Sequence, residues 1–199
     1  MLTSCDGSSL VVDKLSDQTG EQHTAVTCFY FDFAAQKEQT ATSILGSILK
    51  QVISGTERVP EDIWRALQAQ KKAASGRKPQ LGDIMNVLQL ITSSQRTFMV
   101  IDALDESKAE QRFRLFDSLK VILEKSPGAR IFVTGRPHIC PEIETRLAGR
   151  VTSVSLGPAR EDIVQFLRAR LSEDETPEAM NESLEAEILE KIPGSISDM

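Results

Sequence analysis

Short apolar runs alternate along this chain with longer segments in which apolar residues recur at helical spacing. The four runs are rich in β-branched and aromatic residues, which is typical of buried parallel strands. They comprise residues 25–31, 97–101, 130–134 and 151–156. Strands that alternate with helices form βαβ units around a mainly parallel sheet. The pattern therefore predicts an α/β fold in which helices flank a mainly parallel sheet.

Helical periodicity also predicts where the helices lie and how they begin. Thr40 or Thr42 can cap the helix that follows the first strand. The next helix is expected to begin after Pro60, because proline is tolerated in a first turn. Its apolar side would carry Ile63, Trp64 and Leu67. The apolar positions at helical spacing fall within residues 44–52, 63–67, 81–91, 113–123, 163–171 and 180–192.

Length and composition suit one medium-sized α/β domain. The chain has 199 residues, of which 40% are hydrophobic. We place the domain at residues 1–171. Residues 172–178 are acidic and contain Pro177, so we interpret residues 172–199 as an acidic linker followed by the start of another helical part.

The charge of the chain argues against two classes of partner. Its formal net charge is −6, which leaves no broad basic field for nucleic acid or for an anionic membrane. Residues 73–80 contain two adjacent basic residues, Arg77 and Lys78, and are predicted to form an exposed loop. Solvation explains this short cluster, and contact with nucleic acid is the alternative.

Cysteine and histidine usage point to a cytosolic protein without a metal-hydrolase site built on histidine or cysteine ligands. Cys5, Cys28 and Cys140 lie far apart and form no CxxC pair, as expected for reduced thiols. No apolar run approaches the roughly 18 residues of a membrane span, and the first residues lack a basic leader. His23 and His138 belong to no HExxH motif, and no GxSxG motif is present. We therefore expect a cytoplasmic location.

Acidic residues gather where the second predicted strand ends. Asp102 follows four apolar residues, and Asp105 and Glu106 lie three and four residues beyond it. Ligands of an open α/β sheet bind at the carboxyl ends of its strands. There, Asp102 would hold a hydrated Mg²⁺, and the two later carboxylates would orient or deprotonate a water molecule. The alternative is a solvated acidic loop.

The third predicted strand delivers Thr134 and Arg136 to the same edge of the sheet. A guanidinium group in this position can contact phosphate oxygens in bidentate fashion and stabilise charge on a transferred phosphoryl group. The alternative is that Arg136 pairs with a carboxylate of a neighbouring helix.

Together these segments resemble a known family. Residues 100–106 resemble the Walker B motif of NACHT-type STAND ATPases, and residues 131–137 resemble their sensor 1 strand. Residues 28–33 and 161–163 are similar to fungal members, including those grouped as nephrocystin-3-like N-terminal domains. The resemblance covers about residues 10–192. It implies a three-layer P-loop NTPase-like fold that binds ATP or GTP with Mg²⁺, and other NACHT-domain proteins as partners.

The resemblance also implies a role for each candidate residue. Asp102 would coordinate Mg²⁺, Asp105 and Glu106 would activate the attacking water, and Arg136 would sense the γ-phosphate. Thr134 would join Arg136 in contacting the nucleotide. The chain has Ala103 where many relatives have glycine and Gly135 where they usually have serine.

The Walker A phosphate loop is absent from these 199 residues, which contain no GxxxxGK[ST] run. The loop matters because its backbone N–H groups cradle phosphates, its lysine reaches the β- and γ-phosphates, and its hydroxyl binds Mg²⁺. In relatives it lies just before a helix similar to residues 8–15. The resemblance thus implies a truncated domain that lacks the Walker A strand, which in the family lies between the strand bearing Arg136 and residues 151–156. Residues 172–199 would begin a truncated helical subdomain.

Three functional hypotheses follow. The first is a truncated or degenerate NACHT-type module that keeps a Mg²⁺-binding edge and hydrolyses little or no NTP. The second is a non-catalytic module that docks on full-length relatives through exposed sheet edges. The third is a competent NTPase with a different phosphate site.

Overall fold

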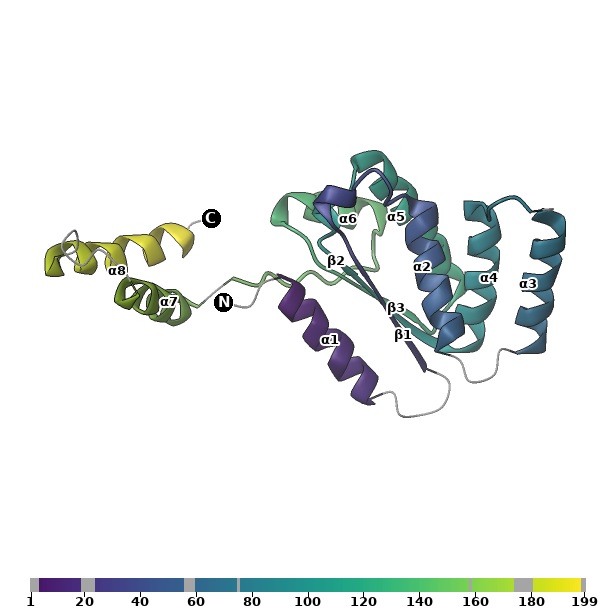
Figure 1. The fold of residues 1–199 in the computed structure, drawn as a ribbon, viewed down its shortest axis with the longest axis horizontal. Helices are drawn as coiled ribbons and strands as arrows, with labels where there is room; N and C mark the ends of the chain where they lie inside the picture. The colour runs from purple at the N-terminus through teal and green to yellow at the C-terminus, as the bar shows by residue number, and fades with distance from the viewer. Residues whose placement is uncertain are drawn as a thin grey trace. The chain divides into compact units, whose positions relative to one another are not determined.

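The chain comprises two compact units, and a computed structural model describes most of both. The described residues are 4–18, 24–55, 60–74, 76–157, 159–173 and 181–197. Residues 2–152 form the first unit and residues 153–199 the second. Figure 1 shows the sheet and its helices in the first unit and a pair of helices in the second. The boundary of the predicted family domain, at residue 171, stays a prediction.

Three parallel strands form the sheet of the first unit, in the order β1-β2-β3. They are β1 (Thr24–Tyr30), β2 (Arg96–Asp102) and β3 (Ala129–Val133). Tyr30 of β1 is in register with Asp102, and Ile101 with Val133. The first three predicted strands are therefore confirmed to within one residue at each end, and the prediction of an α/β fold with a parallel sheet is confirmed with them.

One face of the sheet is buried under several helices, and the apolar core lies there. Side chains alternate between the faces of a strand, and Met99 and Ile101 point into this core. Thr40 caps α2 through a capping box, and α2 then buries Ile44 and Ile48 completely. The helices of this layer are α2 (Ala41–Ser54), α4 (Leu81–Ser94) and α5 (Ala109–Lys125), with α3 (Glu61–Ala74) packed on α4.

The structure differs from the prediction in two details of α3. Ile63 is buried and Leu67 is partly buried, because residues four apart share one face of a helix. Trp64 lies about a quarter turn away and is exposed, so its predicted place on the apolar side was wrong. The helix also continues through Ala74, which shortens the loop predicted for residues 73–80. In that loop Arg77 pairs with Asp83 across 3.2 Å.

The opposite face of the sheet is covered by α1 (Ser4–Gln18), which contacts β1 and β2 (Figure 1). Helices therefore lie on both faces, which gives three layers. Phe98, Val100 and Asp102 alternate with the core residues of β2 and so point toward α1. Phe132 of β3 is in register with Val100 on this face, and 38% of its surface is exposed.

The two edges of the sheet differ. At the outer edge of β1, the side-chain amide of Gln51 accepts a hydrogen bond from the Cys28 N–H at 2.9 Å and donates one to the Cys28 carbonyl at 2.7 Å. The edge of β1 is thus occupied by a side chain of α2. At the outer edge of β3, no strand pairs with the sheet within the described residues.

The predicted fourth strand, residues 151–156, is not a strand in the structure. The segment is irregular through residue 157, and Val154 and Leu156 are 73% and 87% exposed. β-Propensity reflects packing against neighbours more than an intrinsic backbone preference. Without a paired neighbour, the run of β-branched residues does not form a strand, and the local pattern misled the prediction.

Short helices complete the first unit, and two longer ones make up the second. The 3-10 helices η1 (Phe33–Ala35), η2 (Leu104–Glu106) and η3 (Pro137–Ile139) follow the three strands, and η3 leads into α6 (Cys140–Arg146). In the second unit α7 (Arg160–Ser172) and α8 (Glu182–Ser197) contact each other. Both longer helices were predicted, whereas α6 was not.

Candidate functional site

The candidate site lies at the carboxyl edge of the sheet, where β2 ends in Asp102 and β3 ends beside it. The chain turns sharply after Asp102, because Ala103 adopts a left-handed conformation with φ 54° and ψ 44°. That turn directs the next residues into η2. The predicted candidates Asp102, Asp105, Glu106, Thr134 and Arg136 all lie in these two strand-end segments.

Asp102 is the most buried of these residues, with 1% of its surface exposed. Its Oδ1 accepts a hydrogen bond from the Ser8 hydroxyl at 2.5 Å and a second from the Thr134 hydroxyl. Its Oδ2 is buried and has no hydrogen-bond partner among the described residues. A buried polar atom without a partner costs about 1–3 kcal/mol in the free energy of folding. Such an atom needs a structural explanation, and a bound ligand that supplies the missing partner is one.

Ser8 is the site residue that sequence reasoning missed. It lies in the second turn of α1, is completely buried, and is 94 residues away from Asp102 in the chain. No spacing in the sequence indicates this contact, and the GxxxxGK[ST] run, whose final hydroxyl residue binds Mg²⁺ at the start of the helix after the phosphate loop, is absent from these residues. The prediction that α1 resembles that helix pointed to this region without singling out Ser8.

Thr134 ties the ends of β2 and β3 together. Its hydroxyl donates to Asp102 and accepts a hydrogen bond from the Ala103 N–H at 3.0 Å. Its backbone N–H donates to the Ile101 carbonyl, and its carbonyl accepts from the Leu104 N–H. Thr134 therefore holds both the Asp102 carboxylate and the left-handed turn that follows it.

Asp105 and Arg136 form an ion pair across the same edge. The Arg136 Nε lies 3.4 Å from the Asp105 Oδ2, and the Arg136 backbone N–H donates to the Asp105 Oδ1 at 3.2 Å. Only 7% of the Asp105 side chain is exposed, against 77% of the Arg136 side chain. Gly135 lies between Thr134 and Arg136 at a crowded point, because a Cβ atom there would lie 2.5 Å from the Ile139 Cδ1. The two contacts with the Asp105 carboxylate therefore hold the turn in which Arg136 lies.

Glu106 is the last residue of η2, and side chains from two other segments hold this part of the chain in place. The side-chain amide of Gln36 donates to the Glu106 carbonyl at 2.5 Å. Arg112 of α5 donates to the Ser107 carbonyl at 2.9 Å and pairs with Glu142 of α6. Glu106 itself is only partly buried. The structure places its carboxylate on the same short helix as Asp105, beside the candidate site.

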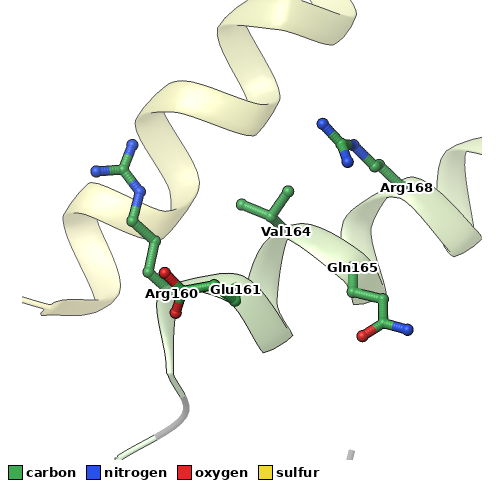
Figure 2. A pocket seen from close by; sticks show the side chains of 5 residues that line it. All are labelled: Arg160, Glu161, Val164, Gln165 and Arg168. Carbon is green, nitrogen blue, oxygen red and sulfur yellow. The ribbon is translucent and has the colours of Figure 1, made fainter.

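Away from the carboxyl edge of the sheet, a hollow of about 410 Å³ lies along α7 in the second unit. It is lined by Arg160, Glu161, Val164, Gln165 and Arg168. Figure 2 shows Val164 between the two arginines, and none of the candidate residues lines this hollow.

The described part of the chain contains no group of three His, Cys, Asp or Glu side chains arranged to hold a metal ion. None of its helices is long and apolar enough to cross a membrane.

Comparison with known families gives a match over most of the first unit. Residues 7–136, more than half of the chain, match the family model described as nephrocystin 3, N-terminal. The chain belongs to this family. Searches of curated proteins and of solved structures found no match. The matched region of the nephrocystin 3 N-terminal family includes Ser8 and all five predicted site residues, whereas residues 151–156 and the second unit lie outside it.

Proposed function

We propose that this chain is a NACHT-type nucleotide-binding module of a signalling STAND protein, which binds Mg²⁺ with ATP or GTP and hydrolyses little or none of it. The observation that carries the proposal is the environment of Asp102. A buried carboxylate at the end of a central strand receives two hydroxyl hydrogen bonds on one oxygen and has no partner on the other.

The donor set around Asp102 fits Mg²⁺ better than it fits other metals. Mg²⁺ prefers oxygen ligands, and proteins commonly offer it only one or two carboxylates, while water and phosphate oxygens complete the shell. Asp102 would hold the ion, and the hydroxyls of Ser8 and Thr134 lie within hydrogen-bond distance of the same carboxylate. When bound, Mg²⁺ supplies positive charge that neutralises phosphate oxygens.

The phosphate end of a nucleotide would meet Arg136. Its side chain is largely exposed, and Asp105 holds its backbone in place. A guanidinium group contacts phosphate oxygens in bidentate fashion, which suits the predicted role as a γ-phosphate sensor. Thr134 would contribute to nucleotide binding mainly by orienting Asp102.

Weak hydrolysis follows from two features. The 199 residues contain no GxxxxGK[ST] run, so the lysine and the N–H cradle that stabilise the transferred phosphoryl group are missing from this sequence. Asp105 is engaged by Arg136, so only Glu106 remains to orient an attacking water. Little or no turnover is therefore the expected behaviour of such a site.

The open edge of β3 favours a second candidate function, which is a non-catalytic interaction module that docks on full-length relatives. An edge strand with unpaired backbone groups is a template for pairing with another chain. This function requires no nucleotide, and the experiment below separates the two.

The test is a calorimetric titration of the purified chain with Mg²⁺ alone, with MgATP and with MgGTP. Asp102→Asn keeps an oxygen that accepts from Ser8 and Thr134 but removes the charge. Asp117→Asn, on the exposed side of α5, removes the same charge elsewhere. We expect Mg²⁺-dependent nucleotide binding that Asp102→Asn abolishes and Asp117→Asn preserves. No binding by a chain that melts cooperatively would reject the proposal and favour the docking module.

A further inference from the structure

Tyr30 is the last residue of β1 and lies directly beside Asp102 in the sheet. The two residues are in parallel register, and neighbouring strands of a sheet lie about 4.8 Å apart. Phe31 belongs to the apolar core and Phe29 packs against it, with their ring centroids 5.1 Å apart. Because successive side chains of a strand point to opposite faces, Tyr30 points to the α1 face, as Asp102 does. The phenol ring and the carboxylate are therefore neighbours at the carboxyl edge.

The Tyr30 side chain is partly open to solvent. Its exposed fraction is 39%, and its hydroxyl forms no hydrogen bond to another residue that the structure describes. A tyrosine combines an apolar ring with a hydroxyl that can donate and accept. The hydroxyl of Tyr30 can therefore donate to a ligand without breaking a contact inside the protein.

Tyr30 and Arg136 flank Asp102 from opposite sides of the sheet edge. Strand β2 is the central strand, so β1 brings Tyr30 to one side of Asp102 and β3 leads to Arg136 on the other. Phosphate oxygens on an ion held by Asp102 would lie between these two side chains. A hydroxyl and a guanidinium group both donate to phosphate oxygens, and such charge-assisted hydrogen bonds are stronger than neutral ones.

The terminal phosphate of a nucleotide is the group that this arrangement reaches. Mg²⁺ in nucleotide sites commonly bridges oxygens of the β- and γ-phosphates. In the proposed function Arg136 contacts the γ-phosphate, and Tyr30 lies across Asp102 from it. A nucleoside diphosphate has no γ-phosphate, so it would leave the Tyr30 hydroxyl without a partner. The contact would thus favour the triphosphate.

We infer that Tyr30 donates its hydroxyl to the γ-phosphate and makes the site select a nucleoside triphosphate over the corresponding diphosphate. Tyr30 is a binding residue in this role, and no bond is made or broken. The inference rests on the proposed function, since it requires a nucleotide bound through Asp102. It adds the β1 side to a site that so far consists of residues from α1 and from the ends of β2 and β3.

The first test is a calorimetric titration of the full chain and of Tyr30→Phe with MgATP, MgADP, MgGTP and MgGDP. Tyr30→Phe removes the hydroxyl and keeps the ring, so the variant should fold, and a thermal melt checks this. We expect its dissociation constant for the triphosphate to rise at least about tenfold, because a hydrogen bond to a charged group is lost. The dissociation constant for the diphosphate should stay unchanged.

Ser93→Ala is the matched control for the loss of a hydroxyl. Ser93 is exposed near the end of α4, just before β2 begins, and therefore lies at the amino edge of the sheet. This variant should bind triphosphate and diphosphate as the unaltered chain does.

Nitration provides a second measurement that needs no substitution. Tyr30 is the only tyrosine among the 199 residues, so nitrotyrosine detected by mass spectrometry reports on this one ring. Its partial exposure makes the ring accessible to the reagent. We expect MgATP or MgGTP to slow the nitration, whereas Mg²⁺ alone and the diphosphates should leave its rate unchanged.

The outcomes separate this inference from the proposed function. Triphosphate binding that Tyr30→Phe leaves unchanged would overturn the role of Tyr30 while the proposed function stands. Equal losses for triphosphate and diphosphate would overturn the selectivity, and so would a nitration rate that no triphosphate slows. A folded chain that binds no nucleotide would overturn both.

Discussion

The two faces of the sheet are built from the same three strands and carry different chemistry. On the core face, Met99 and Ile101 are fully buried beneath three helices, and their neighbours are apolar. On the other face, α1 brings a serine to a buried aspartate, and Phe132 is left partly exposed. The apolar packing of the core face stabilises the unit, whereas the α1 face is less completely packed and carries the candidate site.

The largest expected effect comes from a mutation on the core face. Ile101→Ala removes a fully buried side chain from the central strand, and we expect the free energy of unfolding to fall by about 2–5 kcal/mol. Phe132→Ala deletes a larger side chain from the α1 face, yet it should cost clearly less because that ring is partly exposed. Chemical denaturation of the monomeric protein measures both. Equal losses would show that the two faces are packed equally well in solution.

The second prediction concerns the polar contact on the α1 face. Ser8→Ala removes a hydrogen bond to a buried carboxylate, and we expect the free energy of unfolding to fall by about 1–3 kcal/mol. Ser9→Ala is the control, because Ser9 is exposed on the same turn of α1 and should change stability by no more than about 0.5 kcal/mol. If the two variants were equally stable, α1 would not hold Ser8 against Asp102.

The smallest expected effect is a gain in stability at the turn after Asp102. Ala103 has a left-handed backbone that costs about 1 kcal/mol for a residue with a Cβ atom. Ala103→Gly relieves that cost, and after the entropy lost from the unfolded chain we expect a net gain of about 0.5 kcal/mol. Ala109→Gly, in the first turn of α5, should have the opposite sign. A destabilised Ala103→Gly variant would mean that this turn relaxes in solution.

Sequence reasoning succeeded where local pattern and burial coincide. The strands β1, β2 and β3 are continuous apolar runs because helices or neighbouring strands surround them, and their ends were predicted to within one residue. The same rule placed Asp102, Thr134 and Arg136 at one edge of the sheet, since parallel strands end together. These features follow from local sequence patterns and from the rule for parallel strands.

The remaining features depend on which segments meet in space. Residues 151–156 have the composition of a strand, but pairing requires a neighbour that composition does not specify. The contact between Ser8 and Asp102 spans 94 residues, which no local spacing reveals. Arg136 and Asp105 were assigned separate roles from sequence, and only the structure shows that they form a pair. Identifying such contacts requires the tertiary arrangement.

The Gln51 side chain at the edge of β1 has a consequence for assembly. Its amide presents one donor and one acceptor in the way that a peptide group of a neighbouring strand would, so it acts as a terminator of the sheet. A sheet with one terminated edge and one open edge can be extended in only one direction. Edge-to-edge pairing that continues in both directions, as a fibril requires, is therefore blocked at β1.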